Sequence, residues 1–287
     1  MKIAIVTDSS AYIPERAMQG LPIHVMPVWL LWDDDRYRDG VDIDPETFYQ
    51  RLRSSKTLPT SSQPSAGEFE VLFRQLAAEY DAIVCVLVSA RISGTLASAM
   101  SARAGFQSGR PGSAIEMQIV DAQSSSMGLG LVVLAAARAA AAPGATPDEV
   151  VAVARAMIPR VEFLFVVDTL EYLQRGGRIS LTKRLLGTAL QIKPLLHFEE
   201  GQIVPLTQAR TKRKALDLLL DLAEERLAGR PMAEAAVADI DCCAEGDGVA
   251  ARVRARFDPP LLHRARVSPV VGTHVGPGAI GFAFYAE

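Results

Sequence analysis

The sequence predicts an α/β protein with two domains, on three observations. The chain has 287 residues, which exceeds the ~100–200 residues of one typical domain. A strand, loop and helix pattern recurs three times before Pro143, which is typical of a layered domain with a largely parallel sheet. Beyond Pro159 this regular alternation is lost. We therefore expect an N-terminal α/β domain at residues 1–159 and a smaller C-terminal α+β domain at residues 160–287.

The N-terminal half supplies the elements of the predicted parallel sheet. Apolar runs at residues 3–7, 83–88 and 119–121 indicate strands, and the run at 83–88 is continuous enough to be buried on both faces. Asp44 before Pro45 is typical of a capped helix start. Further helices are expected at 66–80, from Ser93, at 131–142 and at 147–157, and a polar loop at 54–65.

The C-terminal half mixes the two kinds of element. Strands are predicted at residues 163–167, 203–206, 235–239 and 281–285. A short helix at 170–177 ends in two glycines, and residues 214–226 form an amphipathic pattern.

Composition and charge exclude several classes of protein. A formal net charge of -3 argues against a basic chain built to coat nucleic acid. No apolar run approaches the ~20 residues of a membrane span, and the N-terminal segment lacks a secretory pattern, so we expect a cytoplasmic protein. The three cysteines and four histidines have no metal-ligand spacing, and no metal is expected. A solvated turn is favoured over a metal site at residues 33–35, because consecutive carboxylates diverge.

Hydroxyl side chains cluster after the strands of the predicted parallel sheet. They occupy residues 7–10, 89–95 and 124–126, and the loop at 60–65 adds more. Ligands of open α/β sheets bind at the carboxyl edge of the strands, where hydroxyl groups and helix N-termini bind anions. The pattern predicts a small-anion site, although each loop taken singly also fits helix caps and turns.

Histidine and arginine residues in the second half are further candidates. His274 lies among glycines at 272–278, which favours either a backbone close to a ligand or a turn with an incidental histidine. Arg178 follows a predicted helix end, where arginine often binds phosphate or carboxylate. The cationic run at 210–214 indicates either a solvated helix start or a docking surface for an acidic or phosphorylated partner.

Nine sequence strings occur in one order along almost the whole chain. Together they resemble the DegV family of bacterial fatty-acid-binding proteins, which includes the acyl-carrying subunits of fatty acid kinase. The strings are IVTDSS, YRDGVDI, LPTSSQPS, RISGT, VDAQSSSMGLG, VDTLEYLQRGGRIS, QIKPLL, IVPLTQARTKRKAL and GTHVGPGAIG.

The resemblance implies that one long-chain fatty acid, of the palmitate or oleate class, is held between the two domains. Its tail is implied to enter an apolar tunnel, and its carboxyl group to meet hydroxyl side chains. Carried over by position, the carboxylate site comprises Ser62, Ser61, Ser93, His274 and Thr273. The family often has Thr at position 61, and Ser61 keeps the hydroxyl group. With no buried cation in this set, we hypothesise that the carboxyl group binds protonated.

The resemblance also implies a partner. Arg178 and Arg210 match positions that, in kinase-associated members, are linked to presenting the acyl group to an ATP-dependent fatty acid kinase. The chain has no P-loop or GxGxxG motif, which favours a non-enzymatic carrier without a cofactor. Two alternatives remain open: a phosphotransferase or hydrolase that uses His274 with Ser93, and a regulatory protein that responds to lipid by domain closure.

Overall fold

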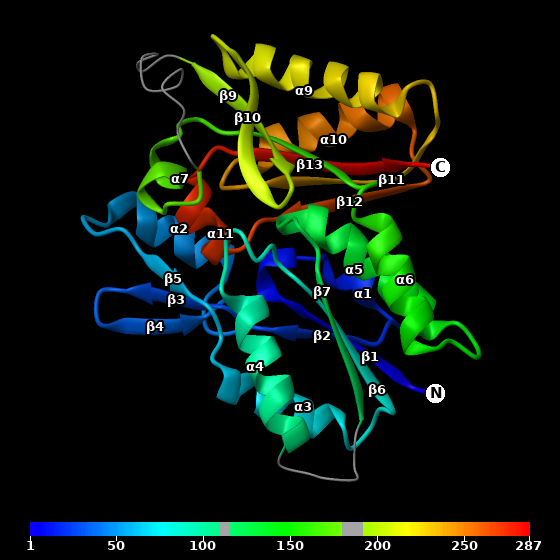
Figure 1. Cartoon of the computed structure of the whole chain (residues 1–287). Helices are drawn as coiled ribbons and strands as arrows, with labels where there is room; N and C mark the ends of the chain where they lie inside the picture. The colour runs from blue at the N-terminus through cyan, green and yellow to red at the C-terminus, as the bar shows by residue number, and fades with distance from the viewer. Residues whose placement is uncertain (109–114, 180–191) are drawn as a thin grey trace.

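The structure is a computed structural model that describes residues 1–108, 115–179 and 192–287. Helices and sheets alternate in layers, and helix α5 (Ser126–Ala141) lies between the two larger sheets (Figure 1). The predicted α/β class is confirmed, with a parallel sheet in the N-terminal half and a mixed sheet in the C-terminal half.

The N-terminal sheet is parallel throughout, in the order β2-β1-β6-β7. Its two central strands are buried along their whole length, because helices cover both faces of the sheet. The strands are β1 (Ile3–Asp8), β2 (Ile23–Met26), β6 (Ala82–Leu87) and β7 (Glu116–Asp121).

The C-terminal sheet has six strands in the order β10-β9-β8-β13-β11-β12. Neighbouring strands are antiparallel, except for the parallel pair β11 and β12. The sequence predicted parts of four of these strands and missed two. The strands are β8 (Glu162–Val166), β9 (Lys193–Glu199), β10 (Gln202–Ala209), β11 (Met232–Asp239), β12 (Leu261–Arg266) and β13 (Ile280–Ala286).

A small antiparallel sheet contradicts the prediction of an uninterrupted polar loop at 54–65. The strand β5 (Thr60–Ser62) lies inside that segment and pairs with β3 (Trp29–Trp32), which also pairs with β4 (Asp35–Arg38). Its residues are all hydroxylic, so they carry no apolar alternation, and the strand forms because β3 offers it a partner.

The helices enclose these sheets. The sequence did not predict the helices Glu15–Met18 and Cys243–Phe257. Helix α5 begins at Ser126 rather than near residue 131, and the segment around His274, for which a turn or a backbone close to a ligand had been left open, is the helix α11. The helices are α1 (Glu15–Met18), α2 (Pro45–Ser54), α3 (Ala66–Leu76), α4 (Thr95–Ser108), α5, α6 (Pro147–Met157), α7 (Glu171–Arg175), α9 (Lys212–Leu227), α10 (Cys243–Phe257) and α11 (Pro269–Val275), with a 3-10 turn at Ser9–Ala11.

Helix α5 joins the two halves. It is buried almost all round, as expected for a helix that contacts strands β1 and β6 on one side and β11 and β13 on the other. One hydrophobic cluster consequently runs from Ile3 to Ala283. The six strands of the mixed sheet all follow residue 160, and we keep the division into 1–159 and 160–287 as a proposal.

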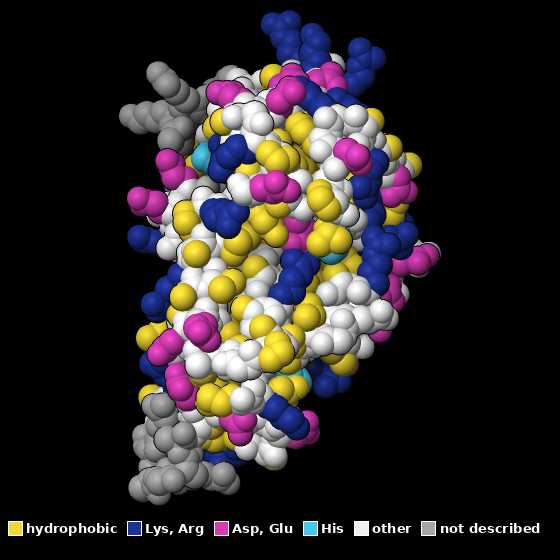
Figure 2. Space-filling view, turned by 90° about the vertical axis from the view of Figure 1, so that its right-hand side faces the viewer, with side chains coloured by type: hydrophobic (Ala, Val, Ile, Leu, Met, Phe, Trp, Pro, Cys, Tyr) yellow, Lys and Arg dark blue, Asp and Glu magenta, His cyan; other side chains and the backbone are white. Residues whose placement is uncertain are grey.

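The surface agrees with the modest net charge. On the face shown in Figure 2, cationic and acidic side chains are interspersed with hydrophobic ones. In the described part of the chain, no helix is both long and apolar enough to cross a membrane. Within the same residues, no cluster of His, Cys, Asp and Glu is suited to holding a metal ion.

Candidate functional site

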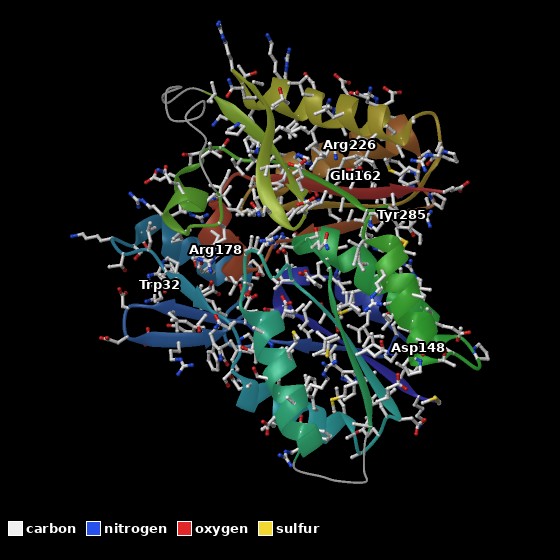
Figure 3. The ribbon with its side chains drawn as sticks, in the orientation of Figure 1. Trp32, Asp148, Glu162, Arg178, Arg226 and Tyr285 are labelled. Carbon is white, nitrogen blue, oxygen red and sulfur yellow. The ribbon has the colours of Figure 1, made fainter. Side chains whose placement is uncertain are left out.

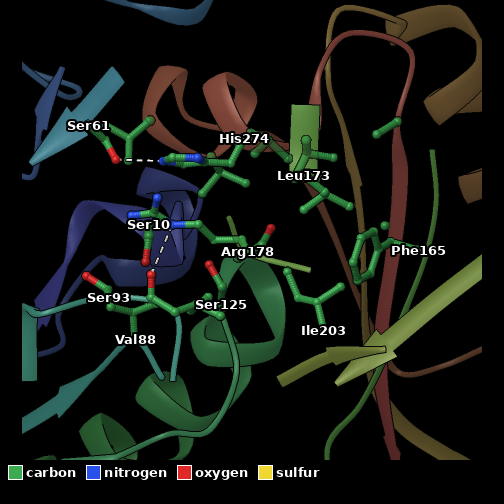
Figure 4. A pocket seen from close by; sticks show the side chains of 18 of the residues that line it. Ser10, Ser61, Val88, Ser93, Ser125, Phe165, Leu173, Arg178, Ile203 and His274 are labelled. Carbon is green, nitrogen blue, oxygen red and sulfur yellow. Dashed lines mark hydrogen bonds between the residues drawn. The ribbon is translucent and has the colours of Figure 1, made fainter. Parts of the chain in front are cut away.

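A cavity lies between the carboxyl edge of the parallel sheet and the mixed sheet. Its empty space is about 920 Å³ when it is counted out through the opening to solvent. Hydroxyl, imidazole and guanidinium groups gather on one side, and Phe165, Leu173 and Ile203 lie on the other (Figure 4). The cavity is therefore amphipathic along its length.

The parallel sheet brings three serine loops to the polar end. The loops follow β1, β6 and β7, and their strands end at the same edge because they are parallel neighbours. They contribute Ser10, Ser93, Ser125 and Ser126 to the lining. The predicted clustering of hydroxyl groups at this edge is therefore present in the structure.

Asp8 holds two of these loops together. Its side chain is fully buried and accepts hydrogen bonds from the backbone N–H of Ser10 at 3.0 Å and of Val88 at 2.9 Å. Burial raises the pKa of this carboxyl, although the hydrogen bonds from Ser10 and Val88 act in the opposite direction. Asp8 is thus a positioning residue, which fixes the ends of β1 and β6 beside the cavity.

Ser61 and His274 form a direct contact at the polar end. Ser61 Oγ lies 2.6 Å from His274 Nε2, which joins strand β5 to helix α11 (Figure 4). Burial, and then the nearby charge of Arg178, lower the pKa of His274 to about 4, so the imidazole is neutral at pH 7. Within the described residues its Nδ1 is buried without a hydrogen-bond partner.

Arg178 places a cation at the cavity wall. Its Nε donates to the carbonyl of Ile92 at 3.2 Å, and its Nη1 donates to the carbonyl of Gly176. Burial lowers the pKa of the guanidinium, and no carboxylate pairs with it among the residues that the structure describes. The predicted carboxylate set contained no cation, whereas Arg178 brings one to the cavity lining, and its guanidinium offers charge to an anion.

The remaining predicted residues lie at different places. Ser93 lines the cavity, with its hydroxyl 2.9 Å from that of Thr95. Ser62 and Thr273 do not line it: Ser62 alternates with Ser61 along β5, and the Thr273 hydroxyl donates to the carbonyl of Pro269. Arg210 is exposed, just before helix α9.

Three phenylalanines contribute to the apolar lining beside aliphatic side chains, and none of the three had been predicted as a site residue. Phe163 and Phe165 lie two residues apart on β8, so both side chains point to the same face, where Phe198 of β9 joins them. The ring of Phe163 stacks on Phe165 at 5.5 Å and on Phe198 at 6.0 Å between centroids. The alternation of phenylalanine in this strand was the available signal.

The fold and the cavity define an α/β protein with an amphipathic site between two sheets. The family model described as "Uncharacterised protein, DegV family" matches residues 2–287, and the chain belongs to this family. Among curated relatives, the protein DegV of Bacillus subtilis is 33% identical over 285 residues, covering 99% of each chain. A DegV domain-containing protein of Streptomyces coelicolor is 37% identical over 282 residues, covering 97% of this chain and 96% of the relative.

Solved structures agree with this assignment. A DegV family protein from Thermus thermophilus, described by its fatty acid binding, superposes with a TM-score of 0.89 at 30% identity, and each chain is fully covered. DegV of Bacillus subtilis, described as a fatty acid binding protein, superposes with a TM-score of 0.89 at 32% identity, again with full coverage. The family resemblance inferred from the sequence is confirmed.

Proposed function

We propose that this chain binds one long-chain fatty acid, with the carboxyl group at the serine, His274 and Arg178 end and the tail against the phenylalanines. The observation that carries the proposal is the cavity itself, which is polar at one end and apolar over the rest. Fatty acid binding by the solved relatives at 30% and 32% identity supports it.

Tail burial supplies most of the binding energy in this proposal. About 14 methylenes at ~0.8 kcal/mol each contribute ~11 kcal/mol before the cost of immobilising the ligand. The polar end then has to orient the head group. Ser61 and Ser93 offer hydroxyl donors, and Arg178 offers a charge-assisted hydrogen bond, so we propose that the carboxyl group binds ionised rather than protonated.

We propose that Ser62 and Thr273 support the site from behind rather than touch the ligand. Ser62 follows Ser61 in β5, and the Thr273 hydroxyl is already bonded within α11. The contact between Ser61 and His274 would then fix both side chains for the head group.

The second part of the proposal is that a separate ATP-dependent fatty acid kinase phosphorylates the bound carboxyl group. The exposed side chain of Arg210 suits a contact with such a partner. Arg178 lines the cavity, so it would present the carboxyl group of the bound fatty acid to the kinase. The chain loaded with oleate would be mixed with a bacterial fatty acid kinase subunit and ATP, and acyl phosphate trapped with hydroxylamine. Arg210→Ala should keep oleate but lose product, whereas Arg213→Ala, a matched exposed residue, should not.

The short contact between Ser61 and His274 is the observation that favours an enzyme instead. A hydrolase or phosphotransferase needs a base that takes the proton of its nucleophile and a third group that orients the base. A conjugate-acid pKa of about 4 makes His274 a weak base, and its Nδ1 has no carboxylate partner in the described chain. Ser93, the predicted nucleophile, bonds Thr95 instead. The carrier is therefore the better-supported function.

Native mass spectrometry of the purified chain, followed by denaturing extraction, tests the carrier proposal. One fatty acid per chain is the expected result. The absence of any bound acid, together with no rise in thermal midpoint on adding palmitate or oleate, would overturn it.

A further inference from the structure

Two phenylalanines separate the cavity from a second, larger cleft. Phe163 and Phe198 line both spaces, and they are the residues common to the two linings in the described part of the chain. The second cleft has about 1550 Å³ of empty space, open to solvent, and charged groups such as Arg155, Glu162 and Arg226 line it. In Figure 3, Arg178 at the polar end of the cavity lies well apart from Glu162 and Arg226.

The pair stands at the apolar end of the cavity. Phe165, which stacks on Phe163, lies across the cavity from Ser61 and His274 in Figure 4. An acyl chain whose carboxyl group meets Ser61 would therefore extend toward these rings. Beyond them lies a space lined by charged side chains, where additional methylenes would gain less from burial.

The surrounding backbone fixes one ring of the pair more firmly than the other. A Cβ atom on Gly281 would come within 2.8 Å of Phe163 Cε2, and one on Gly128 within 2.9 Å of Phe163 Cβ. These two glycines let the backbone approach Phe163 closely, and Phe163 is buried, with 9% of the residue exposed. Phe198 is only partly buried, so replacing its side chain by a smaller one should destabilise the core less than the same change at Phe163.

We infer that the stacked Phe163–Phe198 pair is the stop that sets the longest acyl chain the cavity accepts, and that the second cleft is the space behind this stop. The inference rests on the proposed function, because it assumes that an acyl tail fills the cavity. It assigns a specificity-determining role to Phe198 in particular.

Phe198→Ala tests the stop, with Phe165→Ala as the matched control. Both variants remove one ring of the same cluster, but Phe165 lines only the first cavity. The measurement is the affinity for palmitate and for arachidate, which is four carbons longer. Phe198→Ala should improve the preference for arachidate over palmitate by about tenfold, while Phe165→Ala should leave that ratio within about twofold of the wild type. Phe198→Leu, a milder change, should give a smaller shift in the same direction.

An equal shift in both alanine variants, or an unchanged ratio in Phe198→Ala and Phe198→Leu while palmitate still binds, would overturn the inference. Thermal midpoints show whether each variant folds. If Phe198→Ala does not fold, the arachidate-to-palmitate ratio of Phe198→Leu tests the inference. Failure of the proposed function gives a different result, since the wild-type chain itself would bind neither acid.

Discussion

Two histidines in the C-terminal half have opposite surroundings. His263 Nε2 lies 2.7 Å from Glu234, which also accepts two hydrogen bonds from Arg138 at 2.6 Å and one from the Tyr285 hydroxyl at 2.8 Å. Among the described residues, the His274 side chain has one hydrogen-bond partner, the hydroxyl of Ser61, and its Nδ1 is buried without one.

The two histidines belong to two kinds of polar cluster, one fully hydrogen-bonded around Glu234 and one with unused hydrogen-bonding groups at the cavity. Around Glu234 both carboxylate oxygens have charged or polar partners, and the network ties helix α5 to the mixed sheet. At the cavity, His274, Ser126 and Arg178 keep hydrogen-bonding capacity that no described side chain uses. An unsatisfied buried polar group costs stability, which a polar ligand group would relieve. Thr7 and Ser124 also have buried hydroxyl groups without a hydrogen-bond partner in the described chain but do not line the cavity, so the unused capacity of Ser126 and His274 supports a ligand site only together with their place in the lining.

The largest expected effect comes from breaking the satisfied network. Burial opposes the charge of Glu234, but hydrogen bonds from Arg138 and His263 outweigh it and lower its pKa to about 2. Glu234→Gln should reduce the free energy of unfolding by about 4 kcal/mol, because Arg138 loses its carboxylate partner. Urea denaturation measures this loss. Asp217→Asn breaks the half-exposed pair with Arg252 and should cost less than about 0.5 kcal/mol. A similar loss of unfolding free energy in both variants would contradict the special role of the Glu234 network.

The second prediction concerns the pH dependence that His274 adds. Its pKa of about 4 lies below its ordinary value of 6.5, so between these values the unfolded chain binds a proton that the folded chain does not. The contribution of His274 to stability is therefore retained above pH 6.5 and falls by about 3 kcal/mol as the pH falls to 4.

The measurement must isolate His274 from a group of opposite sign. Burial raises the pKa of Asp39 to about 7, so Asp39 favours the folded chain as the pH falls. The decisive quantity is the difference between the stability curves of the wild type and His274→Gln. That difference should change by about 3 kcal/mol between pH 6.5 and pH 4, and a constant difference would contradict the lowered pKa.

The third prediction compares two adjacent serines. Ser61→Ala removes the hydroxyl that lines the cavity, and it should weaken palmitate binding about tenfold. Ser62→Ala makes the same chemical change one residue further along β5, outside the cavity lining, and should leave the affinity within about twofold. Isothermal titration of delipidated protein measures both. The reverse pattern would show that Ser62 is the ligand contact.

Much of the polar end could be predicted from the sequence. The serine loops follow strands whose apolar runs identify them, and parallel strands bring their carboxyl ends to one edge whatever the details of packing. Helix α11 also had a local signal that went unused, since Ser268 caps it and Pro269 takes its first position.

Other features depend on contacts between distant segments. Strand β5 has no apolar alternation and exists because it pairs with β3, so the choice between Ser61 and Ser62 depends on which face of β5 meets α11. Arg178 was predicted to bind phosphate or carboxylate past a helix end and, from the resemblance, to present the acyl group to a partner, but it was not placed in the carboxylate set. Its place at the cavity wall follows from its hydrogen bond to the carbonyl of Ile92, 86 positions away in the chain.

The smallest expected effects on stability come from two serines of the loops at the sheet edge, one with a hydrogen-bond partner and one without. Ser89 Oγ donates to the carbonyl of Gly201 at 2.7 Å, whereas Ser126 Oγ is buried at the cavity without a partner in the described chain. Ser89→Ala should therefore cost about 1 kcal/mol of unfolding free energy, and Ser126→Ala should be neutral or stabilising by about 0.5 kcal/mol in the delipidated protein. Urea denaturation with and without palmitate tests this. If the Ser126 hydroxyl serves the ligand, palmitate should stabilise Ser126→Ala less than the wild type, and equal stabilisation would assign Ser126 no part in binding.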